Sequence, residues 1–514
     1  MGFLNATVVS WMIFLPLAGI PFLLLAKSDR AARWIALVTT LVAFAVSLHL
    51  PFHFDNAQGG FQFLQSHAWI PAFHIHYLVG VDGLSLWLSV LTTFLSVIGV
   101  AVSWKAINKN VTAFFILLLL LETGMLGVFC SLDLFLFYVF WEITLVPMAF
   151  LIGIWGHERR LYAAVKFFLY TMAGSVLMLA SILWLYNLSG TFNYIAIKAA
   201  LASGALALSP ATQLWLFLGF FIAFAIKVPL FPFHTWLPDA HVEAPTAGSV
   251  LLAGVLLKMG PYGMLRFNLE LFPQAARACA PVIVALGIVG IIYGALVAFV
   301  QPNMKKLVAY SSVSHMGFII VGVFTFSLIG TQGAIYQMLN HGISTGGLFI
   351  LVGMLYERRH TFELSEYGGI ATVMPVYAAF FVWIVLSSVG LPLLNGFVGE
   401  FLIMLGTFTA AVAHAHLYAI LAALGVILGA LYLLHWTRMT IWGELSNAKN
   451  KLLRDLDGRE LAVLASIALL TLVMGLASPY FLNKTQASTA AAVAAYQPPP
   501  AAPALSAALH GGKP

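Results

Sequence analysis

Lysines occur inside three apolar segments that are long enough to cross a membrane: Lys166, Lys227 and Lys258. Two of them belong to one block, residues 225–260, which reads AIKVPLFPFHTWLPDAHVEAPTAGSVLLAGVLLKMG and places Pro229 two residues after Lys227. A lysine at bilayer depth costs about 2.5–3.5 kcal/mol even on a lenient insertion scale, so it needs water or a partner carboxylate. Such lysines beside a proline-interrupted helix indicate a path for ions or protons.

Carboxylates at similar depth could partner these lysines. Glu142, in FYVFWEITLVPM, lies well inside the fifth apolar segment. Opposite Lys227 it would hold the lysine charged, and moving it away would let the lysine release its proton. Glu122, in LLLLLETGM, has Thr123 as its expected hydrogen-bond partner, and Glu400 follows the stretch GLPLLNGFVG.

Two histidines also fall at membrane depth, His315 in YSSVSHMGF and His341 in YQMLNHGISTGG. The neighbouring Ser, Thr, Asn and Gly residues can admit water, so these imidazoles could relay protons. Asp133 and Lys166 lie nearer the ends of their segments, where we expect interfacial, capping or snorkelling roles. We expect no metal site, because no Cys/His cluster has ligand spacing.

The composition is that of a membrane protein. The 514 residues are 61% hydrophobic and 8% charged, with a mean hydropathy of +0.97, whereas globular domains carry about 25% charged residues. The two cysteines, Cys130 and Cys279, lie in separate apolar runs and cannot ligate an iron–sulfur cluster. Neither a dinucleotide fingerprint nor a phosphate-binding loop is present. The energy for uphill transport must therefore come from another gradient or a partner subunit.

Apolar runs predict fourteen spans, and we expect the N-terminal run to be the first of them rather than a removed signal. If the N-terminus is outside, most of the 24 Lys and Arg residues fall in cytoplasmic connections, so both termini are predicted to be periplasmic. The basic pI of about 9.2 then reflects topology and indicates no nucleic-acid partner. The predicted spans are near residues 3–25, 32–51, 80–103, 112–130, 132–155, 161–188, 211–230, 244–267, 279–300, 306–327, 331–356, 373–412 (interrupted), 417–437 and 460–481.

An internal repeat is suggested by two interrupted segments. Residues 228–233 read VPLFPF and residues 391–397 read LPLLNGF, and an ionisable residue lies near each, Lys227 and Glu400. Broken helices are tolerated at membrane depth only where they line a cavity or are buried in protein. Paired interruptions predict two repeats of opposite topology, as in many transporters.

The block HTWLPDAHVEAPTAGSVLLAGVLLKMGPYGMLRF, together with NMKKLVAYSSVSHMGF and MLNHGISTGGLFILVGMLYERRHT, resembles the antiporter-like subunits of bacterial respiratory complex I, the proton-translocating NADH–quinone oxidoreductase. The resemblance implies an all-α polytopic fold in which helices 4–8 and 9–13 form inverted repeats and helices 7 and 12 are broken. The implied parts are residues 1–110 (helices 1–3 with an outer loop at 52–79), 111–268 (first repeat), 279–438 (second repeat), 439–484 (cytoplasmic loop and helix 14) and 485–514 (a flexible Ala/Pro-rich tail).

The same resemblance implies roles for the buried ionisable residues. Glu142 and Lys227 would be a regulating ion pair, and Lys258 the central proton holder. His315 and His341 would bridge Lys258 to Glu400 through waters, with Glu400 as the outer terminus of the path.

The resemblance also implies where the driving energy arises. The chain would act as a translocase subunit without its own redox site or cofactor. NAD, FMN, iron–sulfur clusters and quinone would belong to partner subunits, and its neighbours in the bacterial inner membrane would be other membrane-arm subunits.

Two alternatives remain at this stage. The first is a subunit of a multisubunit cation/proton antiporter, which shares the fold and the lysine–glutamate pair. The second is a structural spacer that moves no ions. Neighbouring genes for peripheral redox subunits would favour complex I, whereas a cluster of only small membrane proteins would favour the antiporter.

Overall fold

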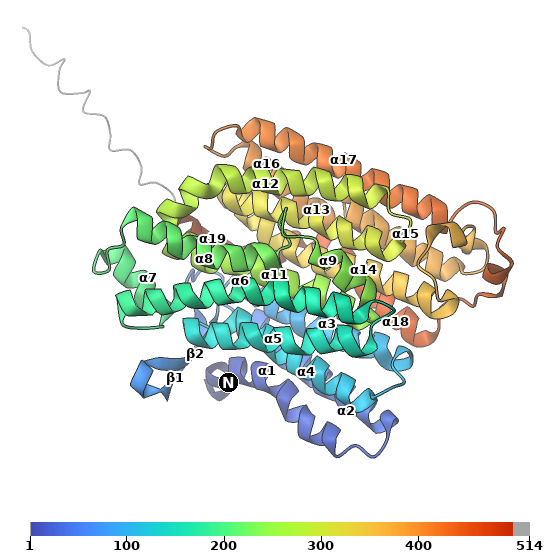
Figure 1. The fold of residues 1–514 in the computed structure, drawn as a ribbon, viewed down its shortest axis with the longest axis horizontal. Helices are drawn as coiled ribbons and strands as arrows, with labels where there is room; N and C mark the ends of the chain where they lie inside the picture. Colours follow the sequence, from blue (N-terminus) through green and yellow to red (C-terminus); the bar gives the residue numbers. More distant parts are fainter. Residues whose placement is uncertain (1, 497–514) are drawn as a thin grey trace, which may run out of the picture.

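The computed structural model describes residues 2–496, and it is a bundle of long helices with one small β-hairpin (Figure 1). Thirteen helices among these residues are long and apolar enough to cross a membrane. The prediction of an all-α polytopic membrane protein is therefore confirmed. The helices are α1 (Gly2–Leu24), α2 (Asp29–His53), α3 (Leu86–Ala106), α4 (Val111–Cys130), α5 (Leu134–Trp155), α6 (Arg160–Ser189), α7 (Tyr194–Ser203), α8 (Pro210–Lys227), α9 (Trp236–Glu243), α10 (Thr246–Leu251), α11 (Leu257–Gly263), α12 (Pro273–Phe299), α13 (Met304–Phe324), α14 (Leu328–Arg359), α15 (Pro375–Val389), α16 (Asn395–Phe408), α17 (Ala415–Thr440), α18 (Gly458–Leu476) and α19 (Ser478–Tyr496).

The interruptions expected in the seventh and twelfth spans are present. Helix α8 ends at Lys227, and the chain turns before α9 begins at Trp236. Helices α15 and α16 are the two halves of the twelfth span, separated at Gly390, whose φ of +85° suits glycine. The inverted relation between the two sets of helices stays a prediction.

The eighth span is irregular in a different way. It runs over Thr246–Leu269 and alternates between α-helix and two π-helical stretches, η2 (Leu252–Leu256) and η3 (Met264–Leu269), on either side of α11. Short π-helical stretches are rare and occur often at functional sites. Lys258 lies on α11 between the two, in a span that the rest of the bundle buries completely.

The long outer loop predicted at 52–79 contains a β-hairpin. Strand β1 (Gln62–Ile70) pairs antiparallel with β2 (Ile75–Val81), with a short turn (Pro71–Phe73) between them. The third span consequently begins at Leu86 and not at residue 80, because residues 75–81 belong to β2. The only sequence signal for this hairpin is the short alternation of aromatic or aliphatic side chains with histidine in residues 73–77 (FHIHY).

The prediction of a flexible tail from residue 485 is wrong as far as residue 496, because α19 continues to Tyr496. Alanine has the highest helix propensity, and the segment from Ser488 is rich in it. Tyr496 is buried, and its hydroxyl lies 3.3 Å from Thr331 Oγ1 of α14. The remainder of the predicted tail, residues 497–514, lies outside the described residues.

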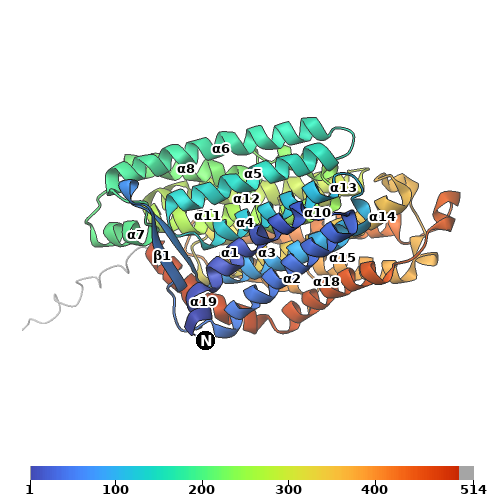
Figure 2. The ribbon, with the colours of Figure 1, turned by 90° about the horizontal axis from the view of Figure 1, so that it is seen from below.

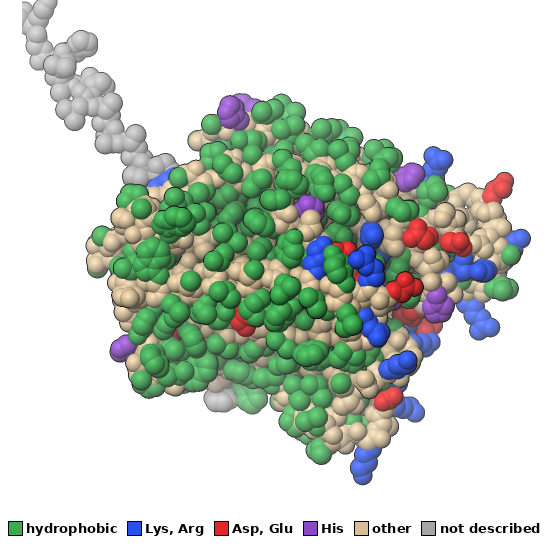
Figure 3. Space-filling model, viewed as in Figure 1, with side chains coloured by type: hydrophobic (Ala, Val, Ile, Leu, Met, Phe, Trp, Pro, Cys, Tyr) green, Lys and Arg blue, Asp and Glu red, His purple; other side chains and the backbone are tan. Residues whose placement is uncertain are grey.

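Charged side chains are unevenly distributed over the bundle. Hydrophobic side chains cover most of the face in Figure 3, while most of the Lys and Arg side chains visible there gather at the end near α15 and α18. The opposite end, near α7, shows few of them. This asymmetry agrees with the charge distribution expected for membrane connections.

A buried charge cluster joins three elements at the end that carries α7. Arg266, which is 2% exposed, lies 2.7 Å from Asp82 and 3.4 Å from Glu270. Glu270 also accepts hydrogen bonds from Lys198 and, at 2.6 Å, from the hydroxyl of Tyr194, both on α7. The guanidinium therefore connects the start of α3 to the end of the eighth span and to α7. From the sequence, Arg266 is expected to be an ordinary basic residue of an outer connection, and no motif indicates that it is buried in a charge cluster.

We expect Arg266→Ala to lower the stability of the folded chain by about 3–5 kcal/mol, because it leaves Asp82 and Glu270 buried without their cation. The measurement is the thermal unfolding midpoint of the purified protein in detergent. The control is Lys105→Ala, which breaks an exposed pair with Asp457 (2.7 Å, Lys105 side chain 65% exposed) and should cost less than about 1 kcal/mol. Equal midpoints for the two variants would contradict a stabilising role for the buried cluster.

Candidate functional site

Lys258 lies at the centre of the bundle with no exposed surface. Its ammonium nitrogen donates to the carbonyl of Ala253, one helical turn earlier in η2, and lies 2.6 Å from Nδ1 of His341 on α14. Two basic groups this close disfavour a second positive charge on the pair. A neutral His341 that accepts at Nδ1 carries its hydrogen on Nε2.

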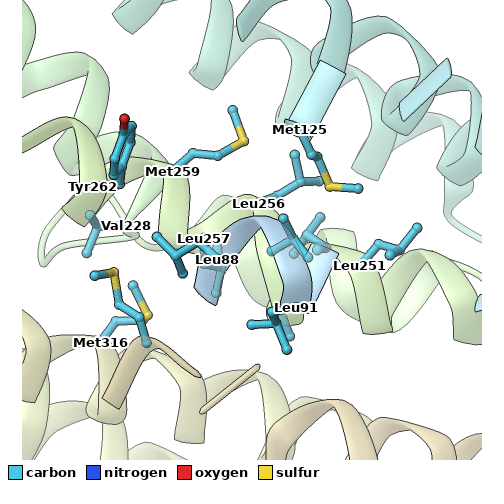
Figure 4. Close-up of a cluster of buried hydrophobic side chains, with 14 of the residues drawn as sticks. Leu88, Leu91, Met125, Val228, Leu251, Leu256, Leu257, Met259, Tyr262 and Met316 are labelled. Carbon is cyan, nitrogen blue, oxygen red and sulfur yellow. The ribbon is translucent and has the colours of Figure 1, made fainter. Parts of the chain in front are cut away.

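Apolar side chains cluster around the neighbours of Lys258 in the chain (Figure 4). Figure 4 shows Leu256, Leu257 and Met259, which flank Lys258 in the chain, beside side chains from α3, α4 and α13. The labelled side chains of that cluster are Leu88, Leu91, Met125, Val228, Leu251, Leu256, Leu257, Met259, Tyr262 and Met316.

Glu400 and His315 form the second polar contact. Glu400, near the start of α16, lies 2.8 Å from Nδ1 of His315 and accepts a hydrogen bond of 3.0 Å from Gln337. The other ring nitrogen of His315 lies 3.3 Å from the hydroxyl of Tyr432. Gly399 permits this close packing of α16 on α14, because a Cβ there would lie 2.7 Å from the side-chain nitrogen of Asn340.

One small cavity separates the two contacts. The rings of His341 and His315 are 5.8 Å apart between centroids, and the cavity has a volume of about 10 Å³. That is about the minimum that holds one water molecule. Nε2 of His341 and the hydroxyl of Ser388 are both buried without a hydrogen-bond partner, and both residues line the cavity. The lining is His315, Gln337, Asn340, His341, Ser344, Thr345, Ser387, Ser388 and Gly396.

The structure therefore aligns four of the predicted residues, in the order Lys258, His341, His315 and Glu400. Two of the three steps are direct contacts, and a small cavity lies between the histidines. The water-mediated link between Lys258 and Glu400 stays a prediction. Asn395, just after the break in the twelfth span, supports the cavity wall through hydrogen bonds with Ser344 and Ser387.

Lys227 and Glu142 are not in direct contact. Among the described residues, no carboxylate lies within 4.0 Å of the Lys227 ammonium; it lies 5.4 Å from the ring centroid of Trp141 and 5.6 Å from that of Phe167. Glu142 is near enough for electrostatic interaction, and one of its carboxylate oxygens is buried without a hydrogen-bond partner. Aromatic faces thus provide part of the stabilisation that the sequence assigned to a carboxylate.

Glu122 is fully buried, and neither of its carboxylate oxygens meets a hydrogen-bond partner within ordinary geometry. The expected bond to Thr123 is absent, and the Thr123 hydroxyl is also unpartnered. The reason is geometric, because consecutive side chains on a helix point in different directions. Glu122 stays a candidate for a functional role and is not in contact with the line from Lys258 to Glu400.

The other two predicted candidates have structural contacts. Asp133 caps α5 by accepting from the backbone N–H groups of Phe135 (3.0 Å) and Leu136 (3.1 Å), and burial raises the pKa of this carboxyl. Lys166 pairs with Asp239 of α9 at 2.7 Å, with both side chains partly exposed. The lysine therefore has an ion-pair partner beside the break in the seventh span, where snorkelling or capping was predicted.

The sequence did not predict a second cluster of buried polar residues, which contains His241 and Lys305. His241 is fully buried, stacks on Phe349 with centroids 4.4 Å apart, and neither ring nitrogen has a hydrogen-bond partner. Lys305 is 3% exposed and donates to the carbonyls of Val242 (3.2 Å) and Ala244 (2.6 Å). From the sequence, both residues were expected near span ends. The only sequence signal for a buried role was that His241 lies in the same block, residues 225–260, as Lys227 and Lys258.

The connection next to this cluster holds His157. Its Nδ1 lies 3.2 Å from the Tyr356 hydroxyl, and its ring packs against Phe362 with centroids 5.4 Å apart. Burial, with a smaller contribution from Lys305, lowers the pKa of His157 to about 4. This imidazole is therefore neutral at physiological pH.

No group of three or more His, Cys, Asp or Glu side chains within residues 2–496 is arranged to hold a metal ion. The chemistry that the site can perform with its own side chains is proton transfer between lysine, imidazole and carboxylate.

Comparisons with known proteins place this geometry in a family. A family model described as NADH:quinone oxidoreductase/Mrp antiporter, transmembrane, matches residues 131–429. The chain is 45% identical over 480 residues to NADH-quinone oxidoreductase subunit M of Rhodobacter capsulatus, covering 91% of this chain and 92% of the relative. It is 42% identical over 485 residues to the subunit of the same name from Rickettsia prowazekii, covering 93% and 97%.

Solved structures of related chains have the same fold as this chain. A chain of respiratory complex I from Thermus thermophilus with bound NADH matches with a TM-score of 0.86 and 34% identity, over 96% of this chain and 100% of that one. A chain of the Mrp complex from Dietzia sp. shares the fold with a TM-score of 0.79 and 22% identity, over 95% of this chain and 52% of that one. Because the family model covers more than half of the chain and the relatives cover nearly all of it, this chain belongs to the NADH:quinone oxidoreductase/Mrp antiporter transmembrane family.

Proposed function

We propose that this chain is the antiporter-like, proton-translocating subunit M of a membrane-bound NADH–quinone oxidoreductase. Membership of the family and the subunit M relatives support the assignment to that complex. The observation that carries proton translocation is the buried line of titratable side chains from Lys258 through His341 and His315 to Glu400. Ionisable side chains are energetically costly inside an apolar membrane bundle, so a line of them indicates a functional role.

The geometry supports a stepwise proton transfer. Lys258 and His341 lie 2.6 Å apart, so a proton on the ammonium could pass directly to Nδ1 of His341. As Nδ1 of His341 takes the proton of Lys258, Nε2 of His341 would release its own proton to a water in the cavity. That water would pass a proton to Nε2 of His315, whose other neighbour is the Tyr432 hydroxyl, and Nδ1 of His315 would give its proton to the Glu400 carboxylate. Each transfer then spans one hydrogen bond or one bridging water, which is the distance that proton exchange requires.

The pair Glu142 and Lys227 would regulate this transfer through charge. Because no carboxylate contacts the Lys227 ammonium, its charge depends on how near Glu142 lies. A positive Lys227 disfavours a second positive charge on Lys258, and a neutral Lys227 removes that repulsion. Changes at the first pair would therefore alter the proton affinity of the second.

The energy for transport would come from partner subunits. We propose that NAD, FMN, iron–sulfur clusters and quinone are held elsewhere in the complex and that this chain has no redox site. Its neighbours would be other membrane-arm subunits, among them further antiporter-like chains. In the bacterial inner membrane, the end rich in Lys and Arg would face the cytoplasm and both termini the periplasm.

The second candidate function is a subunit of a multisubunit cation/proton antiporter, supported by the fold shared with the Mrp chain. That likeness is at 22% identity and shows the fold alone. The two candidates differ in what drives transport, since quinone reduction would depend on the chain in one case and not in the other.

We expect Lys258→Ala and Glu142→Ala each to leave the complex assembled and to lower NADH-driven proton pumping and coupled quinone reduction about tenfold or more. A tenfold loss corresponds to about 1.4 kcal/mol on the rate-limiting barrier. The measurement is the initial rate of acidification in inverted membrane vesicles, together with NADH oxidation.

The matched control is Lys109→Ala, which removes an exposed lysine in the α3–α4 connection and should pump normally. Normal pumping by an assembled Lys258→Ala complex would favour a structural spacer. Normal quinone reduction with impaired sodium-driven proton exchange would favour the antiporter.

A second expectation concerns the cavity between the histidines. Ser344→Leu places extra carbon atoms where only one water fits, so the pumping rate should fall about tenfold while Lys258 and Glu400 keep their own contacts. Thr345→Val changes a residue that lines the same cavity without adding to its length, so it leaves room for the water and should have a much smaller effect than Ser344→Leu. Assembly is monitored by the yield of intact complex. Wild-type pumping by an assembled Ser344→Leu variant would place the proton path elsewhere.

A further inference from the structure

An apolar groove runs along the flank of the bundle between α2 and α18, with α3 and α14 as its floor. Figure 2 shows α2 and α18 on the same flank, opposite α6. The groove has a volume of about 350 Å³, and almost all of its lining is hydrophobic. Its residues are Phe44, Leu48, Pro51, Phe52, Trp87, Val90, Leu91, Phe94, Leu339, Ile343, Ser466, Leu469, Leu470, Met474, Tyr480 and Phe481.

The groove follows α2 from Phe44 to Phe52, which is about 12 Å at 1.5 Å per residue. Its walls are almost entirely apolar along this length. A lipid acyl chain is an occupant that matches an apolar groove of this length at the flank of a membrane bundle.

A cation without a carboxylate lies at one end of the groove. The Lys484 ammonium lies 5.2 Å from the ring centroid of Tyr480, which lines the groove, and donates to the side-chain oxygen of Asn56 at 3.4 Å. The residue is only 7% exposed, and burial lowers the pKa of its ammonium. Lys484 therefore has a neutral partner only, in a place where an anion would stabilise its charge.

The aromatic residues at this end fit the edge of a membrane. Trp87 donates through its indole nitrogen to the Phe481 carbonyl at 3.2 Å, and its ring lies beside those of Tyr480 and Phe481. Amphipathic aromatic side chains concentrate at headgroup level, where their polar atoms meet water and their rings meet hydrocarbon. The cation and the aromatic residues thus mark the headgroup end, and the groove points from there into the bilayer.

We propose that the groove binds an anionic glycerophospholipid of the surrounding bilayer, with its phosphate at Lys484 and one acyl chain between α2 and α18. The chain would lie against Leu339 and Ile343, which are on α14 on either side of His341 in sequence. A bound acyl chain would keep water away from this side of the helix that carries the histidine. The site is independent of the proposed proton path, because none of its residues belongs to that path.

The test uses the intact complex in phosphatidylcholine vesicles that contain a small fraction of phosphatidylglycerol with a photoactivatable diazirine in its acyl chain. After illumination, we expect mass spectrometry to find the lipid attached to peptides covering residues 44–52 and 466–481. Leu469→Trp and Ser466→Phe, which fill the groove, should lower this labelling at least fivefold. Leu461→Trp is the matched control, because Leu461 is exposed on α18 but lies outside the groove, and it should be labelled normally.

Lys484→Gln tests the headgroup. It should lower labelling by the phosphatidylglycerol probe about fivefold relative to a phosphatidylcholine probe with the same acyl diazirine, as expected for one basic residue at a membrane surface. Equal loss with both probes would overturn the anionic assignment. Equal labelling of Leu469→Trp and Leu461→Trp would overturn the acyl-chain site, as would attachment of these peptides to another subunit in place of lipid.

Discussion

The contact between the Lys258 ammonium and His341 is the interaction on which the centre of this protein depends. A lysine with no exposed surface must find polar partners inside the bundle, and here they are a backbone carbonyl and an imidazole. The carbonyl belongs to a π-helical stretch, and the imidazole belongs to α14, the helix that also contributes Gln337 and Asn340. The irregular eighth span and the polar face of α14 are both explained by this requirement.

The break in the twelfth span serves the same purpose at the other end of the line. Ending α15 at Gly390 and starting α16 at Asn395 brings Glu400 onto α14 and gives Asn395 its place in the cavity wall. The break in the seventh span has a different result, because Lys227 ends among aromatic rings and not in an ion pair. The two interruptions look alike in sequence and differ in their chemistry. One completes a line of polar contacts, and the other leaves the Lys227 ammonium over aromatic rings.

Several buried charged residues could not be distinguished, from the sequence, from exposed charges in the connections between spans. Arg266 and Lys305 were counted as ordinary positive charges of membrane connections, yet both are almost fully buried with several acceptors each. Lys484 resembles them in exposure but lacks a carboxylate, and this difference points to a ligand outside the chain. A hydropathy pattern indicates how far a residue lies from the end of its span. The exposed fraction of its side chain depends instead on which other helices and loops pack over that end.

The sequence by itself determined the class of fold, the approximate spans, the interrupted seventh and twelfth helices and the residues of the central line. It could do so because a bilayer requires about 20 apolar residues per span and makes every buried charge conspicuous. The tertiary structure alone decided that Lys258 contacts His341 directly and that Glu142 does not contact Lys227. Those outcomes depend on side-chain direction and on packing between segments far apart in the chain, which the order of residues does not encode locally.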